Sequence, residues 1–256
     1  MTADRRKRGG RRAEELDAAL REGQVEILFQ PQYACADGRL VGAEALSRWN
    51  HPRLGRIGAE ALFDIAERQG EASRLTRHIA GRALAIAAKW PESLRLSLNI
   101  TAMDLAEEDF ADTIAATLAE ARVPPERLKL EITEQALVAD LERGAAQLEK
   151  LAAMGIRIAL DDFGAGFCNF RYLKRLPLDA LKLDRTMIEG VTEDERDLAV
   201  LRGILAMAKA LGLSVTAEGI ETEAQREVVT REGCTAWQGF LGAQPMTAEG
   251  FAALVE

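Results

Sequence analysis

The clearest pattern in the chain is a repeated alternation, from about residue 58 onward, between amphipathic helical segments and short apolar runs. The apolar runs have the length of single strands and read LRLSLNI (94–100), RLKLEIT (127–133), IRIALDD (156–162), DALKLD (179–184) and LSVTAEG (213–219). Several of the helical segments between them end on a glycine, as at Gly155 and Gly212. Such alternation indicates a parallel sheet whose strands are joined by right-handed crossovers.

The opening of the chain follows a different pattern. Two extended segments, 24–34 and 39–49, flank an Asp37-Gly38 pair, which is a strong hairpin signal. With these two segments the chain has about eight strands. A strict (β/α)8 order does not begin with a hairpin, so we expect a modified α/β TIM barrel with an irregular first strand. A doubly wound open sheet is the alternative.

Domain organisation follows from length and from the basic start of the chain. A length of 256 residues is typical of one α/β barrel. We predict a basic linker and connecting helix over residues 1–22 and a single barrel domain over residues 23–256. The first twelve residues carry six Lys and Arg side chains. Because acidic residues follow at once, a solvated linker is favoured over an arm that binds nucleic acid or membrane.

Charge and cysteine content narrow the function classes. The net charge of −8 argues against a DNA-binding protein, and a small anionic ligand would need local positive charge from metal ions, Lys or Arg. Three cysteines without a CxxC pair indicate reduced thiols and a cytoplasmic location. No apolar run reaches the 18 to 20 residues of a membrane span, and no signal-peptide core is present.

Polar side chains gather at the ends of the predicted strands. They are Glu44, Asn99, Glu131, Glu134, Asp161, Asp162, Lys182 and Glu218. A single carboxylate in such a place is usually a helix cap. In a parallel barrel, however, these strand ends meet at one rim, where barrel active sites are built. Several carboxylates at one rim would repel each other unless cations neutralised them.

The residue types at this rim predict a metal site. Carboxylate and amide oxygens suit Mg²⁺ or Mn²⁺, and the two histidines, His51 and His78, form no metal-binding pair. More than four candidate ligands favour two ions, which can activate a water and stabilise in-line attack on phosphorus. Phosphodiester hydrolysis is therefore the expected reaction class. A dinucleotide loop at Gly164-Ala165-Gly166 is excluded because Asn169 stands where the third glycine belongs.

Seven ordered motifs then resemble the EAL-domain family. They are GAEALSRWNHP, SLNIT, LKLEITE, IALDDFGAGF, LKLD, TAEGIE and WQGF, and together they span about residues 25–250. The resemblance implies hydrolysis of cyclic di-guanosine monophosphate (c-di-GMP) to linear pGpG with Mg²⁺ or Mn²⁺. It also implies a barrel whose first strand is antiparallel, which accounts for the opening hairpin.

The same resemblance assigns roles to individual residues. Glu44, Asn99, Glu131 and Asp161 match ligands of a first ion, and Asp161 would bridge to a second ion that Asp162 helps to hold. Lys182 and Glu218 would order the nucleophilic water. Which of them, if either, is the general base stays open, because a hydroxide between two metals needs no separate base. Glu134 matches a glutamate that braces the loop after DDFG, and Gln30, Arg48 and Gln238 match contacts to the dinucleotide.

The resemblance extends to partners and also shows where this chain departs from the family. The family commonly reads DDFGTGYSSL where this chain reads DDFGAGFCNF (161–170), and that loop couples metal binding to a homodimer. The amino-terminal helix resembles a connector to a GGDEF domain, so a GGDEF or sensory domain is expected in a longer parent chain. The alternatives are a c-di-GMP receptor that does not cleave, and a barrel acting on carboxylate substrates through enolates. The enolate reaction would want a further lysine or histidine base, which the strand ends do not provide.

Overall fold

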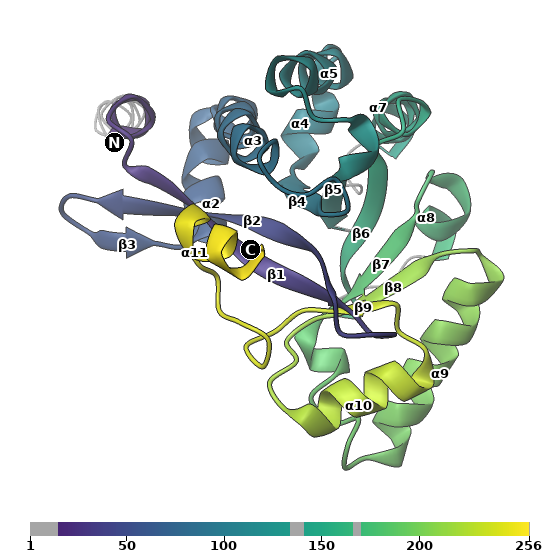
Figure 1. Cartoon of the computed structure of the whole chain (residues 1–256). Coiled ribbons are helices and arrows are strands. Elements are labelled where there is room, and N and C mark those ends of the chain that lie inside the picture. The colour runs from purple at the N-terminus through teal and green to yellow at the C-terminus, as the bar shows by residue number, and fades with distance from the viewer. Residues whose placement is uncertain (1–14, 134–140, 166–169, 256) are drawn as a thin grey trace, which may run out of the picture.

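The computed structural model of the chain describes residues 15–133, 141–165 and 170–255. Eight strands close into one barrel, and helices surround most of it (Figure 1). Around the barrel the order is β1-β9-β8-β7-β6-β5-β4-β2, and β2 pairs back with β1. The strands are β1 (Val25–Ala34), β2 (Leu40–His51), β4 (Arg95–Ile100), β5 (Leu128–Thr133), β6 (Arg157–Phe163), β7 (Ala180–Leu183), β8 (Ser214–Ala217) and β9 (Ala236–Trp237). The predicted modified TIM barrel is confirmed.

The first strand runs against both of its neighbours, as expected. β1 pairs antiparallel with β2, in a register that places Gln30 opposite Glu44, and antiparallel with β9. Every other neighbouring pair in the closed barrel is parallel. At the turn between β1 and β2, Gly38 has a φ of +69°, the left-handed conformation that an Asp-Gly hairpin turn requires.

A short additional strand, β3 (Gly55–Ile57), pairs with the end of β2 and extends that strand beyond the barrel (Figure 1). The sequence pattern does not predict it, because three residues are too few to show an alternation. The side chain of His51 supports the turn, since its Nδ1 accepts the backbone N–H groups of Arg53 and Leu54 at 3.1 and 3.2 Å. His51 is thus a structural residue of this hairpin.

Helices lie between successive strands and cover the outside of the barrel (Figure 1). Residues 15–21 are helical ahead of β1. The later helices are α2 (Ala59–Gln69), α3 (Ala72–Ala87), α4 (Ala102–Ala106), α5 (Phe110–Ala121), α7 (Leu141–Ala153), α8 (Phe170–Arg175), α9 (Glu195–Ala210), α10 (Glu223–Glu232) and α11 (Ala248–Val255), with the 3-10 turns η1 (Pro125–Arg127) and η2 (Arg185–Met187). Within the described ranges, none of the helices combines the length and hydropathy needed to cross a bilayer.

Alternation along each strand separates an apolar exterior from a polar interior. The apolar positions, such as Leu96, Leu98, Leu130, Ile132 and Leu160, are almost fully buried in the core that includes the helices. Their strand neighbours lie on the opposite face and are Ser97, Asn99, Lys129, Glu131, Ala159, Asp161, Ala180 and Lys182. The period of two therefore holds the hydrophobic core outside the barrel and directs the chemically active side chains inward.

Candidate active site

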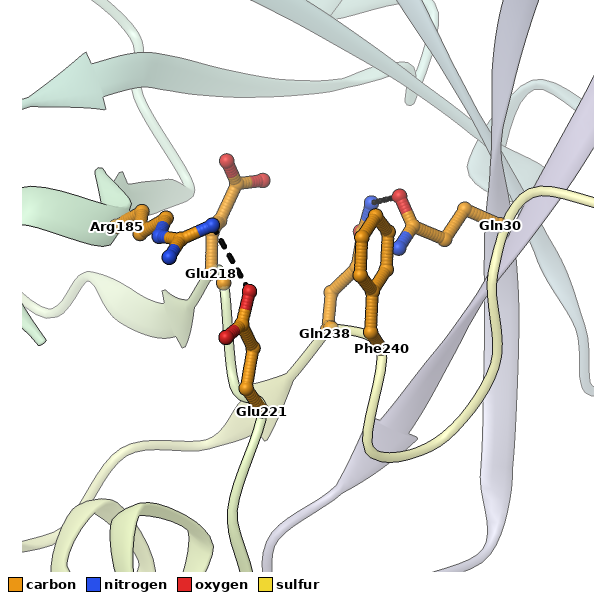
Figure 2. A pocket seen from close by; sticks show the side chains of 8 residues that line it. Gln30, Arg185, Glu218, Glu221, Gln238 and Phe240 are labelled. Atoms are coloured by element: carbon orange, nitrogen blue, oxygen red, sulfur yellow. Dashed lines mark hydrogen bonds and ion pairs between the residues drawn. The ribbon is translucent and has the colours of Figure 1, made fainter. Parts of the chain in front are cut away.

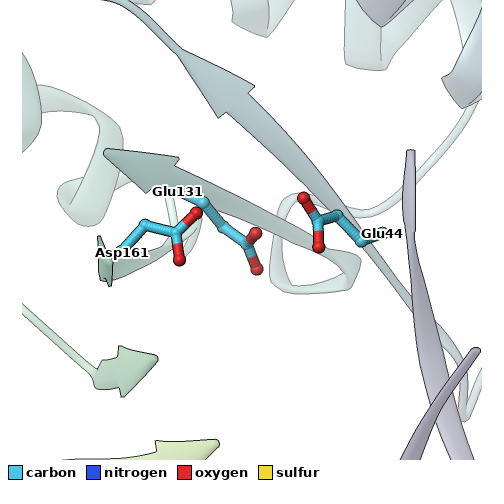
Figure 3. Close-up of side chains that lie close together, drawn as sticks. All are labelled: Glu44, Glu131 and Asp161. Carbon is cyan, nitrogen blue, oxygen red and sulfur yellow. The ribbon is translucent and has the colours of Figure 1, made fainter. Parts of the chain in front are cut away.

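Three carboxylates from three different strands meet inside the barrel near its carboxyl-terminal rim. Glu44 of β2, Glu131 of β5 and Asp161 of β6 point into a common space (Figure 3), and each offers an oxygen within 4.8 Å of the other two. All three are at least nine-tenths buried. Asn99 of β4, which lies beside Glu131 in the parallel register, donates from Nδ2 to Glu44 Oε1 at 2.7 Å. The structure thus brings together four of the side chains predicted from strand ends.

The ammonium group of Lys182 lies at the centre of this cluster. Its Nζ is 2.5 Å from Glu131 Oε2, 2.7 Å from Glu218 Oε1, 3.0 Å from Asp161 Oδ1 and 3.4 Å from Glu44 Oε2. The lysine side chain is 1% exposed, so these contacts are shielded from solvent and correspondingly strong. Lys182 therefore compensates part of the negative charge that the strands concentrate at this rim.

Burial and mutual repulsion shift the pKa values of the clustered groups. Burial raises the pKa of Glu131 to about 7, with Glu44 and Asp161 adding to the effect against the opposing attraction of Lys182. Burial also raises the pKa of Glu218 well above its ordinary value. Although burial acts to raise the pKa of Glu44, Lys182 and hydrogen bonds from Gln238 and Asn99 lower it. For Lys182, burial is outweighed by the surrounding carboxylates, which raise its pKa well above 10.5.

The donor set fits a divalent cation that prefers oxygen ligands. Glu131 Oε1 is buried and has no hydrogen-bond partner among the described residues, and the ammonium of Lys129 is 3.9 Å away. A buried carboxylate oxygen without a donor is costly, and a cation would satisfy it. A second set of carboxylate oxygens within 4.8 Å of one another is formed by Asp161, Asp162 and Glu218. Asp161 belongs to both sets.

The backbone at Asp162 is held in an uncommon conformation. Its φ is +54°, which few residues other than glycine adopt, and its N–H donates to Asp161 Oδ1 at 2.9 Å. This bend turns Asp162 outward at the end of β6, so that two consecutive aspartates both reach the rim. Burial, together with the charge of Asp161, raises the pKa of Asp162 to about 6.

The buried amides of Gln30, Gln238 and Gln32 are linked by hydrogen bonds and form one wall of the site next to Glu44, which we call the amide wall. Gln238 Nε2 donates to Glu44 Oε2 at 2.8 Å and to Gln30 Oε1 at 3.0 Å. Gln238 Oε1 in turn accepts from Gln32 Nε2 at 2.8 Å, and Gln32 Oε1 accepts from Lys129 Nζ at 3.4 Å. Gln32 and Lys129 were not predicted. Strand alternation could have placed both inside the barrel, since they lie two residues from Gln30 and Glu131.

A pocket opens from this wall to the surface. Figure 2 shows Arg185, Glu218 and Glu221 on one side and Gln30, Gln238 and Phe240 on the other. Arg185 Nη1 is paired with Glu221 Oε1 at 2.8 Å, and Phe240 is 56% exposed. Arg185 and Phe240 were also missed, because they belong to loops that carry no periodic pattern.

Among the described residues, the predicted substrate contact Arg48 lies apart from the central cluster. Arg48 is on β2, four residues beyond Glu44 on the same face of the strand, and it donates to the carbonyl of Ser47 at 2.8 Å. Burial lowers the pKa of Arg48. Glu134 lies outside the described residues, as do Phe167, Cys168 and Asn169 of the unusual loop.

Fold and site together define an α/β barrel protein with an acidic rim that could hold metal ions. The EAL domain profile matches residues 13–245, so the chain belongs to the EAL domain family, and Glu44-Ala45-Leu46 on β2 is its signature tripeptide.

Relatives in Pseudomonas aeruginosa are similar over most of this chain. The bifunctional diguanylate cyclase/cyclic di-GMP phosphodiesterase MucR is 36% identical over 245 residues, which are 94% of this chain and 36% of MucR. The cyclic di-GMP phosphodiesterase RocR is 34% identical over 235 residues, which are 91% of this chain and 60% of RocR. The chain therefore spans only about a third of MucR and less than two thirds of RocR.

Solved structures show the same architecture. The MucR phosphodiesterase in complex with c-di-GMP superposes with a TM-score of 0.87 at 35% identity, covering 94% of this chain and 99% of that one. The EAL enzyme Bd1971, bound to cAMP and cyclic-di-GMP, gives a TM-score of 0.89 at 25% identity, covering 99% of this chain and 69% of that one.

Proposed function

We propose that this chain is a phosphodiesterase that hydrolyses c-di-GMP to linear pGpG with two divalent cations, Mg²⁺ or Mn²⁺. The observation that carries the proposal is the pair of carboxylate sets that share Asp161 beside Lys182 and Glu218. Support comes from relatives named as cyclic di-GMP phosphodiesterases and from the structural likeness to a MucR phosphodiesterase in complex with c-di-GMP.

The metal ligands in this proposal come from four strands. Glu44, Asn99, Glu131 and Asp161 would hold one ion, and Asp161 with Asp162 would hold the second. When bound, the ions would activate a water and stabilise the charge that develops on the phosphorus oxygens. The amide of Asn99 donates to Glu44 through Nδ2, which leaves its Oδ1 available as a ligand.

Lys182 and Glu218 then order the attacking water in this proposal. They are in contact at 2.7 Å, so a water bound beside the pair would meet a donor, Lys182 Nζ, and an acceptor, a carboxylate oxygen of Glu218. Burial raises the pKa of Glu218 well above its ordinary value, which suits a carboxyl group that takes part in proton exchange. Glu134 is proposed to brace the loop after Asp162, as in the family pattern.

Substrate contacts are assigned to the amide wall and to Arg48. Gln30 and Gln238 line the open pocket, where their amides can meet the polar edges of the dinucleotide. Arg48 offers a planar fork of donors that suits a phosphate. We further propose a cytoplasmic homodimer, and a GGDEF or sensory domain in a longer parent chain. The cytoplasmic assignment is supported by the two described cysteines, Cys35 and Cys234, which are free and buried.

The direct test is product formation. The chain is incubated with c-di-GMP and Mn²⁺, Mg²⁺ or a chelator, and pGpG is separated by chromatography. We expect pGpG with either metal and none with the chelator. Asp161→Asn should form no product, whereas Glu149→Gln, on the exposed face of α7, should behave as the unaltered chain. Tight binding of c-di-GMP without product in Mn²⁺ would overturn the proposal in favour of a receptor.

A further inference from the structure

The amide wall has a defined direction of hydrogen bonding. Lysine is a donor only, so the ammonium of Lys129 selects the oxygen of Gln32, at 3.4 Å. The opposite end of the same amide, Nε2, must then face Gln238 and meets its Oε1 at 2.8 Å. This in turn directs Nε2 of Gln238 toward Gln30 and Glu44. The donor at the base and the carboxylate of Glu44, which only accepts, therefore favour the same orientation of two successive amides.

We propose that Lys129 and Gln32 are positioning residues that fix the amide of Gln238 for binding the substrate. Neither residue belongs to the metal ligands or lines the pocket of Figure 2. Without the donor of Lys129, the two amides could rotate together. Gln238 Oε1 would then face the carboxylate of Glu44, and Gln238 Nε2 would no longer be available as a donor in the site.

The interior of the barrel is built to admit the long side chain of Lys129. Its register partner on β4 is the small Ser97, and on β6 its register partner is Arg157, which is exposed, followed inside the barrel by the small Ala159. Lys129 is 13% exposed in its side chain, and Gln32 is 3% exposed, so water does not compete freely for this contact. The geometry therefore favours one stable arrangement of the wall.

A role for Lys129 as a plain counter-ion fits the distances less well. Lys182 lies within 3.4 Å of four carboxylates, whereas Lys129 approaches Glu131 Oε1 at 3.9 Å and donates its hydrogen bond to Gln32. The two roles make opposite predictions for a change at Gln32, which carries no charge. Replacing Gln32 interrupts the relay of hydrogen bonds that runs from Lys129 through Gln32 to Gln238, and it leaves the ammonium of Lys129 in place.

The test compares Lys129→Met, Lys129→Arg and Gln32→Met with a control, Lys150→Met, which replaces an exposed lysine of α7. The kinetic part rests on the proposed function. We expect Lys129→Met and Gln32→Met each to raise KM for c-di-GMP about five- to tenfold with kcat changed less than about twofold. Lys129→Arg should restore KM because it keeps the donor, and the double variant should be no worse than either single one. Lys150→Met should change nothing.

A second measurement is independent of turnover. With isotope-labelled glutamine amides, the Gln238 resonance, identified by its loss in Gln238→Met, should shift in Lys129→Met and Gln32→Met and return in Lys129→Arg. An unchanged resonance or an unchanged KM in Gln32→Met would overturn the inference. If the unaltered chain neither binds nor cleaves c-di-GMP, the proposed function fails, and the resonance alone decides whether the relay exists. Thermal unfolding of each variant shows whether a change in KM comes from a destabilised fold or from a misoriented amide of Gln238.

Discussion

At the scale of single residues, the site depends on charges that can coexist only in a fixed arrangement. Four carboxylates contact one ammonium group in the barrel, and the uncharged amides of Asn99 and Gln238 supply further donors to Glu44. Removing a single charge therefore changes the balance for all of them. Substitutions that keep the shape but alter the charge are the most informative.

Glu44→Gln keeps the side-chain volume and removes one charge and one ligand. We expect turnover with Mn²⁺ to fall by at least about a hundredfold, because even residues that only support metal ligands commonly cost that much. Rates measured across a series of Mn²⁺ concentrations would show the loss as weakened metal dependence. Near-normal turnover at saturating Mn²⁺ would mean that Glu44 is not a ligand.

Metal binding should depend on pH through Glu131 and Asp162. Their pKa values are raised to about 7 and about 6, so below these values each carboxyl holds a proton that a cation must displace. Affinity for Mn²⁺ should thus weaken as pH falls from about 8 to about 6, by up to about tenfold per pH unit for each proton displaced. Calorimetry in buffers of different ionisation enthalpy would count the released protons. Asp162→Asn should release fewer, and an affinity independent of pH would contradict this linkage.

How far the sequence predicts the site also depends on particular residues. Asn99, Glu131 and Asp161 could be predicted because each lies at or near the end of an apolar run, whereas Glu44, in the middle of β2, was assigned through the motif GAEALSRWNHP. Lys129 and Gln32 were missed, although alternation places them on the same faces as Glu131 of β5 and Gln30 of β1, because a polar residue inside a predicted strand usually indicates a solvent-facing position. Only a closed barrel makes that face an interior. Their function depends on contacts between β1, β5 and the segment after β9, which are remote in sequence.

At the scale of elements, the loop after β9 sets the position of Gln238 and Phe240. It passes so close to the loop after β8 that a Cβ on Gly239 would lie 2.1 Å from the carbonyl oxygen of Ile220. Hydrogen bonds reinforce this contact, since Ile220 N–H donates to the Gln238 carbonyl at 3.1 Å and Leu241 N–H to the Ile220 carbonyl at 3.0 Å. Both sides of the pocket therefore share one backbone junction.

Gly239→Ala should separate these two loops. We expect KM for c-di-GMP to rise about tenfold or more, because the backbone must shift and displace Gln238. Gly203→Ala in α9 is the matched control: a Cβ there meets nothing within 4 Å, and alanine should increase the free energy of unfolding by about 0.5–1 kcal/mol. Urea titration and steady-state kinetics on both variants would test this, and a Gly239→Ala variant with unchanged KM would refute the dependence.

The elements themselves were largely predictable from periodicity. The strand segments 94–100, 127–133, 156–162, 179–184 and 213–219 each match a strand of the structure, with β6 ending one residue later at Phe163, because buried parallel strands are short apolar runs between clear helix ends. The strand β3 and the two-residue strand β9 were not assigned as such. Both are too short for a pattern, and they are defined by pairing with strands elsewhere in the fold.

At the scale of the whole molecule, the barrel closes through a narrow seam between β1 and β9. Only Tyr33 with Trp237 and Ala34 with Ala236 pair there. The rings of Tyr33 and Trp237 stack with centroids 4.8 Å apart, and a Cβ on Gly242 would collide with both rings. Aromatic packing thus supplements a seam that has few backbone hydrogen bonds.

Trp237→Ala should weaken this closure. We expect the free energy of unfolding to fall by about 3–5 kcal/mol, as for other buried large aromatic residues. Activity should fall with it, since Gln238 is the next residue. Hydrogen exchange would show whether protection is lost first in β1 and β9. A loss spread evenly over all strands would instead indicate that the seam is not the weak point of the barrel.

The reversed direction of β1 has a further consequence for how the protein could be controlled. In a barrel with every strand parallel, the chain enters the first strand at the face opposite the active site. Here Val25 lies opposite Trp49, at the rim end of β2, so the polypeptide enters from the face that carries the candidate active site. The helix at residues 15–21 stands at this entrance, with Glu15 paired to Arg53 and Asp17 to Arg74. A sensory domain joined ahead of that helix would lie beside the candidate active site, so a small displacement of that domain could be transmitted directly to the residues around the substrate.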